Sequence, residues 1–373
     1  MYNKNLLKIG FIYFSSMVLF VGLRIAYNFG FLETYPSFIF NIITQIGIMF
    51  IFPILLILIL YKKPSIQLKK TLNFKKITLK SMVPILILTV LIFFLGVFIS
   101  LFFSALLNFL GFSYNALSNQ GTTTLIMFLQ SLLFSALLPG IFEEIMHRGF
   151  LLNNLSVEIG YRRTIIITSI LFGLIHLNIL QSLSAAFIGA IIAVVTIVSS
   201  SIIPAIIIHT LYNSIVTYLS FAQSQSLWGD GFYDGINYFL QNNHPSIVFA
   251  TSFILLTIIF TLIGLSIVYL FRQNTLSKIS NVRSRIQNAL KQEVFEDKRQ
   301  LDEKEISVIN DVLKKIPAAN MPDIKNINST MDLVFPVNEK DNIKLRQKDM
   351  IFIYGAIFLG FVITLMTFIW GIL

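Results

Sequence analysis

Two adjacent carboxylates, a histidine and an arginine interrupt an apolar stretch of the sequence, as Glu143, Glu144, His147 and Arg148. An ionisable side chain at membrane depth costs about 2.5–3.5 kcal/mol on insertion scales. A cluster of such groups in an apolar stretch therefore indicates a functional site, and its members need partners elsewhere in the chain.

The spacing within this cluster predicts one ion pair and one separate carboxylate. Residues four apart share a face of an α-helix, so Glu144 and Arg148 can pair with each other. Glu143 and His147 lie on the neighbouring face. This arrangement leaves Glu143 as a buried carboxylate without a charged partner, which makes it a candidate general base.

Histidines in two other apolar stretches add polar groups that could join the cluster. His176 follows Phe172 by four residues, and His209 precedes Asn213 by four. A single histidine in an apolar helix is usually a hydrogen-bond partner between helices. When three spans each carry polar groups into the membrane, however, those groups must face one another or water. The fourth histidine, His244, is expected on a surface loop.

The composition is typical of a polytopic membrane protein. Of 373 residues, 55% are hydrophobic and only 12% are charged, about half the charged fraction of a soluble protein. Cysteine is absent, which excludes a disulfide framework, a thiolate metal site and a cysteine nucleophile. The net charge of +10 does not indicate nucleic-acid binding, because many of the lysines gather beside membrane spans.

Apolar stretches long enough to cross a bilayer predict an all-α, polytopic transmembrane helical bundle of eight or nine spans. We expect Pro139 and Gly140 to interrupt the fourth span just ahead of the acids. The predicted spans are 9–29, 37–61, 81–108, 123–154, 164–178, 181–199, 202–220, 246–271 and 350–373.

The distribution of basic residues predicts the orientation of the spans. The loop 62–80 is rich in lysine and has no acid, which is typical of a cytoplasmic loop. Alternation from there places the N-terminus, Arg162 and Arg163 on the same side. The outer loops, none of which contains lysine or arginine, are 111–122, 179–180 and 221–245.

The chain is predicted to have three parts, which are a transmembrane bundle at 1–271, a charged cytoplasmic segment at 272–348 and a last transmembrane helix at 349–373. Within the charged segment, Val282–Lys315 is typical of one or two amphipathic helices, with Asp302 as a candidate N-cap. A solvated tail is the simplest interpretation of this segment.

The predicted topology lets the polar groups of three spans meet. At about 1.5 Å per residue, Glu143 lies roughly 16 Å from the cytoplasmic end of its span, His176 roughly 18 Å and His209 roughly 10 Å. These depths predict one cavity between the midplane and the cytoplasmic face.

Three motifs together resemble those of a known family. They are Glu143-Glu144-x-x-x-Arg148, Phe172-x-x-x-His176 and His209-x-x-x-Asn213. Each motif is weak alone, but all three in this order, each in its own apolar stretch, are similar to the CPBP (Abi) family of intramembrane endopeptidases. That family includes the type II CAAX-prenyl proteases. The resemblance covers a catalytic core at about 123–220.

The resemblance implies a glutamic-type intramembrane endopeptidase that needs no cofactor. Glu143 would be the base that activates a water, and His176 would help to position that water. His209 and Asn213 would stabilise the oxyanion of the tetrahedral intermediate. The site would be oriented by Glu144 and Arg148, whereas His147 occupies a position that the family pattern leaves free.

Two alternatives to this hypothesis remain open from the sequence. A zinc metallopeptidase could use Glu144, His147, His176 and His209 as ligands, although no H-E-x-x-H motif is present. A non-enzymatic scaffold, for bacteriocin immunity or regulation, would use the polar cluster for binding or folding.

The expected partners are the lipid bilayer and a peptide or membrane-protein substrate, and no nucleic acid. A prenylated CAAX protein fits the family name. The composition, rich in lysine, isoleucine and asparagine, is typical of an AT-rich bacterium, so we expect an integral protein of a bacterial cell membrane. In such a cell a peptide pheromone, a bacteriocin precursor or a membrane protein is the expected substrate.

Overall fold

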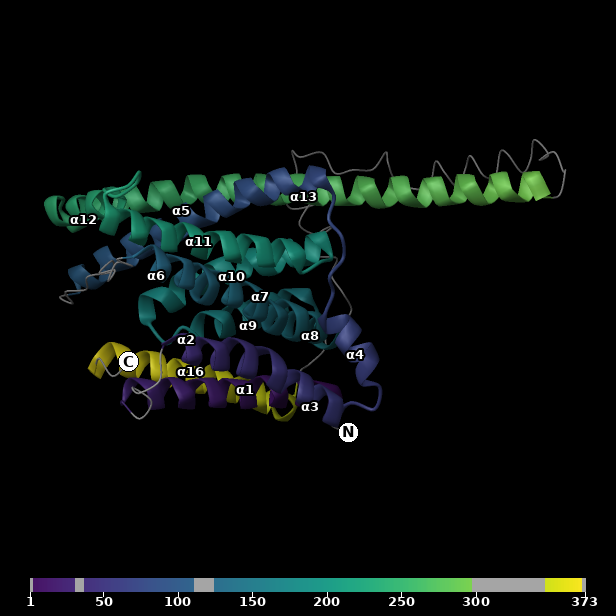
Figure 1. The fold of residues 1–373 in the computed structure, drawn as a ribbon, viewed down its shortest axis with the longest axis horizontal. Coiled ribbons are helices and arrows are strands. Elements are labelled where there is room, and N and C mark those ends of the chain that lie inside the picture. The colour runs from purple at the N-terminus through teal and green to yellow at the C-terminus, as the bar shows by residue number, and fades with distance from the viewer. Residues whose placement is uncertain (1–2, 31–36, 111–123, 297–345, 371–373) are drawn as a thin grey trace.

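The computed structural model describes residues 3–30, 37–110, 124–296 and 346–370 of the chain, and these residues form a bundle of helices without strands (Figure 1). This confirms the predicted all-α fold. The helices are, in order, α1 (Lys4–Asn28), α2 (Ser37–Ile42), η1 (Ile43–Ile51), α3 (Phe52–Leu60), α4 (Pro64–Thr71), α5 (Leu79–Phe109), α6 (Leu125–Ser131), η2 (Leu132–Leu137), α7 (Leu138–Glu144), η3 (Ile145–Leu152), α8 (Asn153–Ile159), α9 (Tyr161–Leu174), α10 (Ile179–Ser199), α11 (Ile203–Gln225), α12 (Phe232–Asn242), α13 (Pro245–Glu296), η5 (Gln347–Met350) and α16 (Ile351–Trp370).

Eight helical stretches in the described part of the chain are long and apolar enough to cross a membrane, within the predicted range of eight or nine. The stretch expected to be a fifth span, 164–178, is not among them. It falls largely within α9, which has 14 residues and is about 21 Å long at 1.5 Å per residue. A helix of this length is shorter than the hydrocarbon core.

Side chains at the helix ends explain where several spans begin. Asn3 accepts a hydrogen bond from the backbone N–H of Leu6 and caps α1, while Thr124 caps α6 by accepting from Met127. Asn178 caps α10 in the same way. Each cap satisfies a backbone donor that the helix itself leaves free. These polar residues therefore mark the points where apolar stretches become helices.

The span that carries the two central carboxylates is helical without a break from Leu125 to Ile159. The interruption expected at Pro139 and Gly140 is therefore wrong. Two π-helical segments, η2 and η3, lie on either side of α7, and Pro139 is the second residue of α7, directly after the π-helical turns of η2. π-Helical turns inside α-helices are frequent at functional sites.

Segments predicted to be cytoplasmic meet at one end of the bundle. Asn73 donates from Nδ2 to the carbonyl of Ser200 at 3.1 Å, and Asn153 donates from Nδ2 to the carbonyl of Lys70 at 3.2 Å. In Figure 1 the start of α1, the helix α4 and the end of α8 lie at this same end, opposite α12. The two sides of the predicted topology are therefore separated in the structure.

Helix α13 is a single helix of 52 residues, about 78 Å long at 1.5 Å per residue, and Figure 1 shows it extending past the bundle. It continues from the predicted eighth span into the charged segment as far as Glu296. The rest of the predicted amphipathic region, including Asp302, lies outside the described residues. The last span, α16, packs beside α1 and contacts α9.

Candidate active site

Glu144 lies at the end of α7, and its side chain is completely buried. Its Oε1 accepts hydrogen bonds from Nη1 of Arg148 and from Nδ1 of His209, both at 2.8 Å. The ion pair expected from the four-residue spacing is thus present. His209 joins it from α11, so this carboxylate ties two spans together.

Arg148 is buried to 2% exposure and has three kinds of contact. Besides Glu144, its Nη2 donates to the carbonyl of Gly189 in α10 at 3.2 Å. The guanidinium carbon also lies 4.1 Å from the centre of the Phe172 ring, a cation–π geometry. A cation in this position is compensated on every side by a carboxylate, a carbonyl and an aromatic face.

Phe172, from α9, is the centre around which the ionisable groups are arranged. Its ring meets those of His147, His176 and His209 edge-on, at centroid distances of 5.0, 5.5 and 5.6 Å. A Cβ added at Gly189 would lie 2.9 Å from the Phe172 ring. Glycine at that position is therefore what lets α10 approach the ring so closely.

Glu143 differs from its neighbour in its surroundings. It is 8% exposed, and its Oε1 accepts a hydrogen bond from Nε2 of Gln45 in η1 at 2.8 Å. No described residue donates a hydrogen bond to its other oxygen, Oε2. Among the described residues no ion pair involves Glu143, and the amide of Gln45 is a contact that the sequence did not predict.

His147 is completely buried, and both of its ring nitrogens are engaged. Its Nδ1 lies 2.8 Å from the backbone carbonyl of Glu143, and since a carbonyl only accepts, Nδ1 carries the proton. Its Nε2 then accepts from the hydroxyl of Tyr13 in α1 at 3.1 Å. The ring is therefore held between its own helix and α1.

A cavity of about 70 Å³ lies between α9, α10 and α11. Its polar lining includes His176, His209 and Asn213, which are three of the four residues predicted to be catalytic. His176 donates from Nδ1 to the carbonyl of Phe172 at 2.9 Å. Asn213 donates from Nδ2 to the carbonyl of Ser135 at 3.2 Å. His176 and His209, which are 33 positions apart in sequence, are thus brought to one small space, whereas Glu143 is not among the residues that line it.

The residues named as an alternative zinc set do not gather around one point. Within the described ranges, no group of three or more histidine, cysteine, aspartate or glutamate side chains is arranged to hold a metal ion. Both nitrogens of His147 are already used, and His209 points its Nδ1 at Glu144. The donor arrangement therefore does not fit a catalytic zinc, which needs three ligands around an open position.

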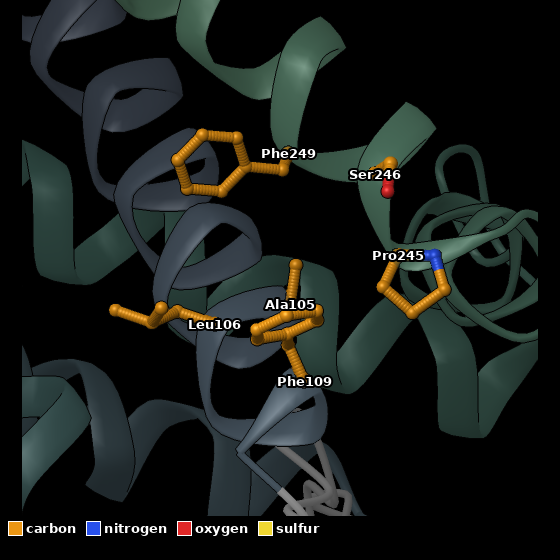
Figure 2. Close-up of a pocket in the computed structure, with 6 residues that line it drawn as sticks. All are labelled: Ala105, Leu106, Phe109, Pro245, Ser246 and Phe249. Carbon is orange, nitrogen blue, oxygen red and sulfur yellow. The ribbon is translucent and has the colours of Figure 1, made fainter.

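A larger cavity, of about 280 Å³, lies elsewhere, between the end of α5 and the start of α13. Figure 2 shows its lining of Ala105, Leu106, Phe109, Pro245 and Phe249, with Ser246 as the one polar side chain among the labelled residues. None of these side chains ionises. This cavity can hold an apolar group but offers no acid, base or nucleophile.

Sequence reasoning missed Gln45 and Tyr13, which contact the predicted site from η1 and α1. A signal for Gln45 was present, because it is a lone amide in the apolar stretch Ile-Ile-Thr-Gln-Ile-Gly-Ile. Polar side chains inside spans usually face a polar partner within the bundle. Tyr13 gave no comparable signal, since tyrosine is common in membrane helices.

Comparison with known proteins agrees with this geometry. Residues 124–215 match the family model described as type II CAAX prenyl endopeptidase Rce1-like. The match contains all three motifs and runs from the start of α6 into α11. No curated protein and no solved structure matches the chain at a significant level. Over this segment, about a quarter of its length, the chain is similar to the type II CAAX prenyl endopeptidases, the family that its three motifs resemble.

Proposed function

We propose that this protein is a glutamic-type intramembrane endopeptidase, which hydrolyses a peptide bond of a membrane-associated protein or peptide by a water that Glu143 activates. The observation that carries the proposal is the difference between the two adjacent carboxylates. Glu144 is fully buried, holds Arg148 and His209 on Oε1, and has a buried Oε2 without a donor among the described residues. Glu143 keeps 8% exposure, and the one described donor to its carboxylate is the neutral amide of Gln45.

This difference assigns the roles of base and orienting residue. A general base must reach the proton that it removes within about 2.6–3.2 Å, so it needs an oxygen that a water can approach. Glu144 is inaccessible to water and acts as the counter-ion of Arg148. In the proposed reaction, a water between Glu143 and His176 would be held from two sides.

The hydrogen bond that His176 makes to the backbone sets its part in the reaction. Because Nδ1 donates to the carbonyl of Phe172, the neutral ring presents a lone pair at Nε2. That lone pair can accept one proton of the water as a hydrogen bond, while Glu143 removes the other. The water oxygen then bonds to the scissile carbonyl carbon.

Two donors near the cavity would stabilise the oxyanion that this attack creates. The amide of Asn213 has two N–H groups, and the carbonyl of Ser135 is the one acceptor for them in the described part of the chain. The Nδ1 of His209 donates to Glu144, so a ring with a second proton would present the N–H at Nε2 to the oxyanion. As the carbon–nitrogen bond breaks, the proton held by Glu143 passes to the leaving amine.

The predicted orientation of the spans indicates from which side a substrate would reach this site. With the N-terminus and 62–80 at the cytoplasmic face, the cavity would open laterally and toward the cytoplasm. Cysteines introduced near Glu143 should then react with a membrane-impermeant maleimide only in inside-out vesicles. Labelling of the same positions from the outer face alone would refute this arrangement.

The direct test is hydrolysis by the purified protein in liposomes. The substrates are two internally quenched peptides of one sequence, one ending in a farnesylated Cys-aliphatic-aliphatic-X motif and one without the lipid. Mass spectrometry of products formed in ¹⁸O-labelled water identifies the bond and shows whether water supplies the new carboxyl oxygen. We expect one heavy oxygen in the product.

Comparative proteomics extends the test to the natural substrate. Membranes of cells that carry the parent protein are compared with membranes of cells that carry Glu143→Gln, with Glu158→Gln as a control carboxylate at the end of the bundle. A protein or peptide that accumulates uncleaved only in the Glu143→Gln cells would be a substrate. A biological function that survived alanine at Glu143, His176 and His209 would favour a scaffold instead.

A further inference from the structure

Gln45 is a buried amide that contacts the carboxylate of Glu143 from a span outside the family match. It lies in the π-helical segment η1, is 7% exposed, and donates from Nε2 to Glu143 Oε1 at 2.8 Å. The matched segment begins at residue 124. The second span therefore contributes a side chain to the candidate site, although this span lies outside the segment that the family model covers.

The surroundings of the amide are otherwise apolar. Ile48 and Met49, on the same helix, are buried, and the hydroxyl of Thr44 is used by the backbone carbonyl of Phe40. Gln45 Oε1 is buried and has no hydrogen-bond partner in the described part of the chain. The side chain is thus held by its donor end only, through Glu143.

The orientation of this contact has one chemical solution. A carboxylate only accepts hydrogen bonds, so the nitrogen end of the amide must face Glu143. Next to it, the rings of Phe50 and Phe142 pack at a centroid distance of 5.1 Å. Because Phe50 follows Gln45 in η1 and Phe142 precedes Glu143, this packing holds the two helices at the separation that the hydrogen bond needs.

We propose that Gln45 is a positioning residue for Glu143. By holding Oε1 of the carboxylate, the amide fixes its rotation and leaves Oε2 to face the reacting water. This inference builds on the proposed function and deepens it, because it assigns part of the catalytic apparatus to the second span. A one-ångström displacement of a reacting group can cost about 100-fold in rate, so a mobile carboxylate would be a poorer base.

The kinetic test uses Gln45→Met and Gln45→Glu in liposomes with the farnesylated quenched peptide. Methionine keeps the length and removes the donor, and we expect kcat to fall roughly 10- to 100-fold with KM within about twofold. Glutamate can donate only when protonated, so Gln45→Glu should recover activity relative to Gln45→Met at acidic pH and lose it at alkaline pH. Gln67→Met is the control, because Gln67 donates to Asn154 away from the cavity.

A spectroscopic test needs no turnover, so it separates this inference from the proposed function. Infrared difference spectra of parent minus Glu143→Gln assign the carboxylate stretch of Glu143. We expect that band to shift in Gln45→Met and to stay unchanged in Gln67→Met. If the parent cleaved no peptide but the band shifted, the proposed function would be in doubt and the contact would stand. An unshifted band, or a Gln45→Met enzyme with the parent's kcat and pH profile, would overturn the positioning role.

Discussion

Replacing Glu144 by glutamine should show what the buried ion pair does for the bundle. Arg148, at 2% exposure, would keep a charge beside the Gly189 carbonyl and the Phe172 ring but lose its counter-ion. Removing one partner of a buried pair typically costs about 3–5 kcal/mol, because the other charge stays buried and uncompensated. We therefore expect the free energy of unfolding of Glu144→Gln to fall by that amount.

A double-mutant cycle separates the ion pair from the contact with His209. The double variant Glu144→Gln/Arg148→Met leaves neither charge behind, so it should be about 2 kcal/mol more stable than the sum of the single losses implies. Its peptidase activity should stay as low as that of Glu144→Gln, since His209 has still lost its carboxylate. This result would show that the Glu144–Arg148 pair stabilises the fold, and that activity depends on the contact between Glu144 and His209.

The assay is unfolding of the purified protein in mixed micelles by increasing sodium dodecyl sulfate, followed by circular dichroism. Glu158→Gln serves as the control, because Glu158 is half-buried and hydrogen-bonds Asn3 at the end of the bundle. Its loss should cost less than about 1 kcal/mol. A Glu144→Gln protein as stable as this control would refute the reasoning about a charge that needs its partner.

Three further changes test other parts of the site. Gly189→Ala would place a methyl group 2.9 Å from Phe172. We expect it to lower the free energy of unfolding by about 1–3 kcal/mol and to reduce peptide cleavage. Gly264→Ala is the control, because the space around Gly264 is open, and it should change neither stability nor cleavage. Tyr13→Phe leaves His147 Nε2 unpaired and should cost about 1–3 kcal/mol in the unfolding assay; an unchanged protein would show that this hydrogen bond is dispensable. Metal chelators should leave cleavage unchanged, and loss of activity that zinc restores would favour the metallopeptidase.

The fold was largely predictable because apolar length and charge asymmetry determine the spans of a membrane protein. The bundle, the eight described helices that are long and apolar enough to span a membrane, and the gathering of 62–80 with the ends of other helices all followed from those two patterns. Helix α9 was harder to predict, because the apolar residues Ile175 and Leu177 follow Leu174, where the helix ends. Hydropathy alone does not show that the helix ends at Leu174.

The uninterrupted span around Pro139 shows a second limit. Proline removes one backbone donor, so the sequence favours a break in the helix. The protein instead keeps the helix by placing π-helical segments on both sides of α7. Such a change of hydrogen-bond register depends on packing against other helices, including the close approach of Gly140 to Thr210, and local sequence does not report it.

One contact in the candidate site could be predicted from the sequence, and the others could not. Spacing along one helix was enough to pair Glu144 with Arg148. The contact of His209 with Glu144, and that of Gln45 with Glu143, join residues 65 and 98 positions apart. No periodicity links positions so distant, so these partners could be found only once the helices were placed in space.

The most direct test of the account is the kinetics of Glu143→Gln on the quenched peptides. We expect kcat/KM to fall by at least about 100-fold, since a positioned general base contributes that much or more. Glu158→Gln should retain the parent's rate, and both variants should unfold near the parent's midpoint. A Glu143→Gln protein that cleaves the peptides as fast as the parent would contradict the assignment of Glu143 as the base.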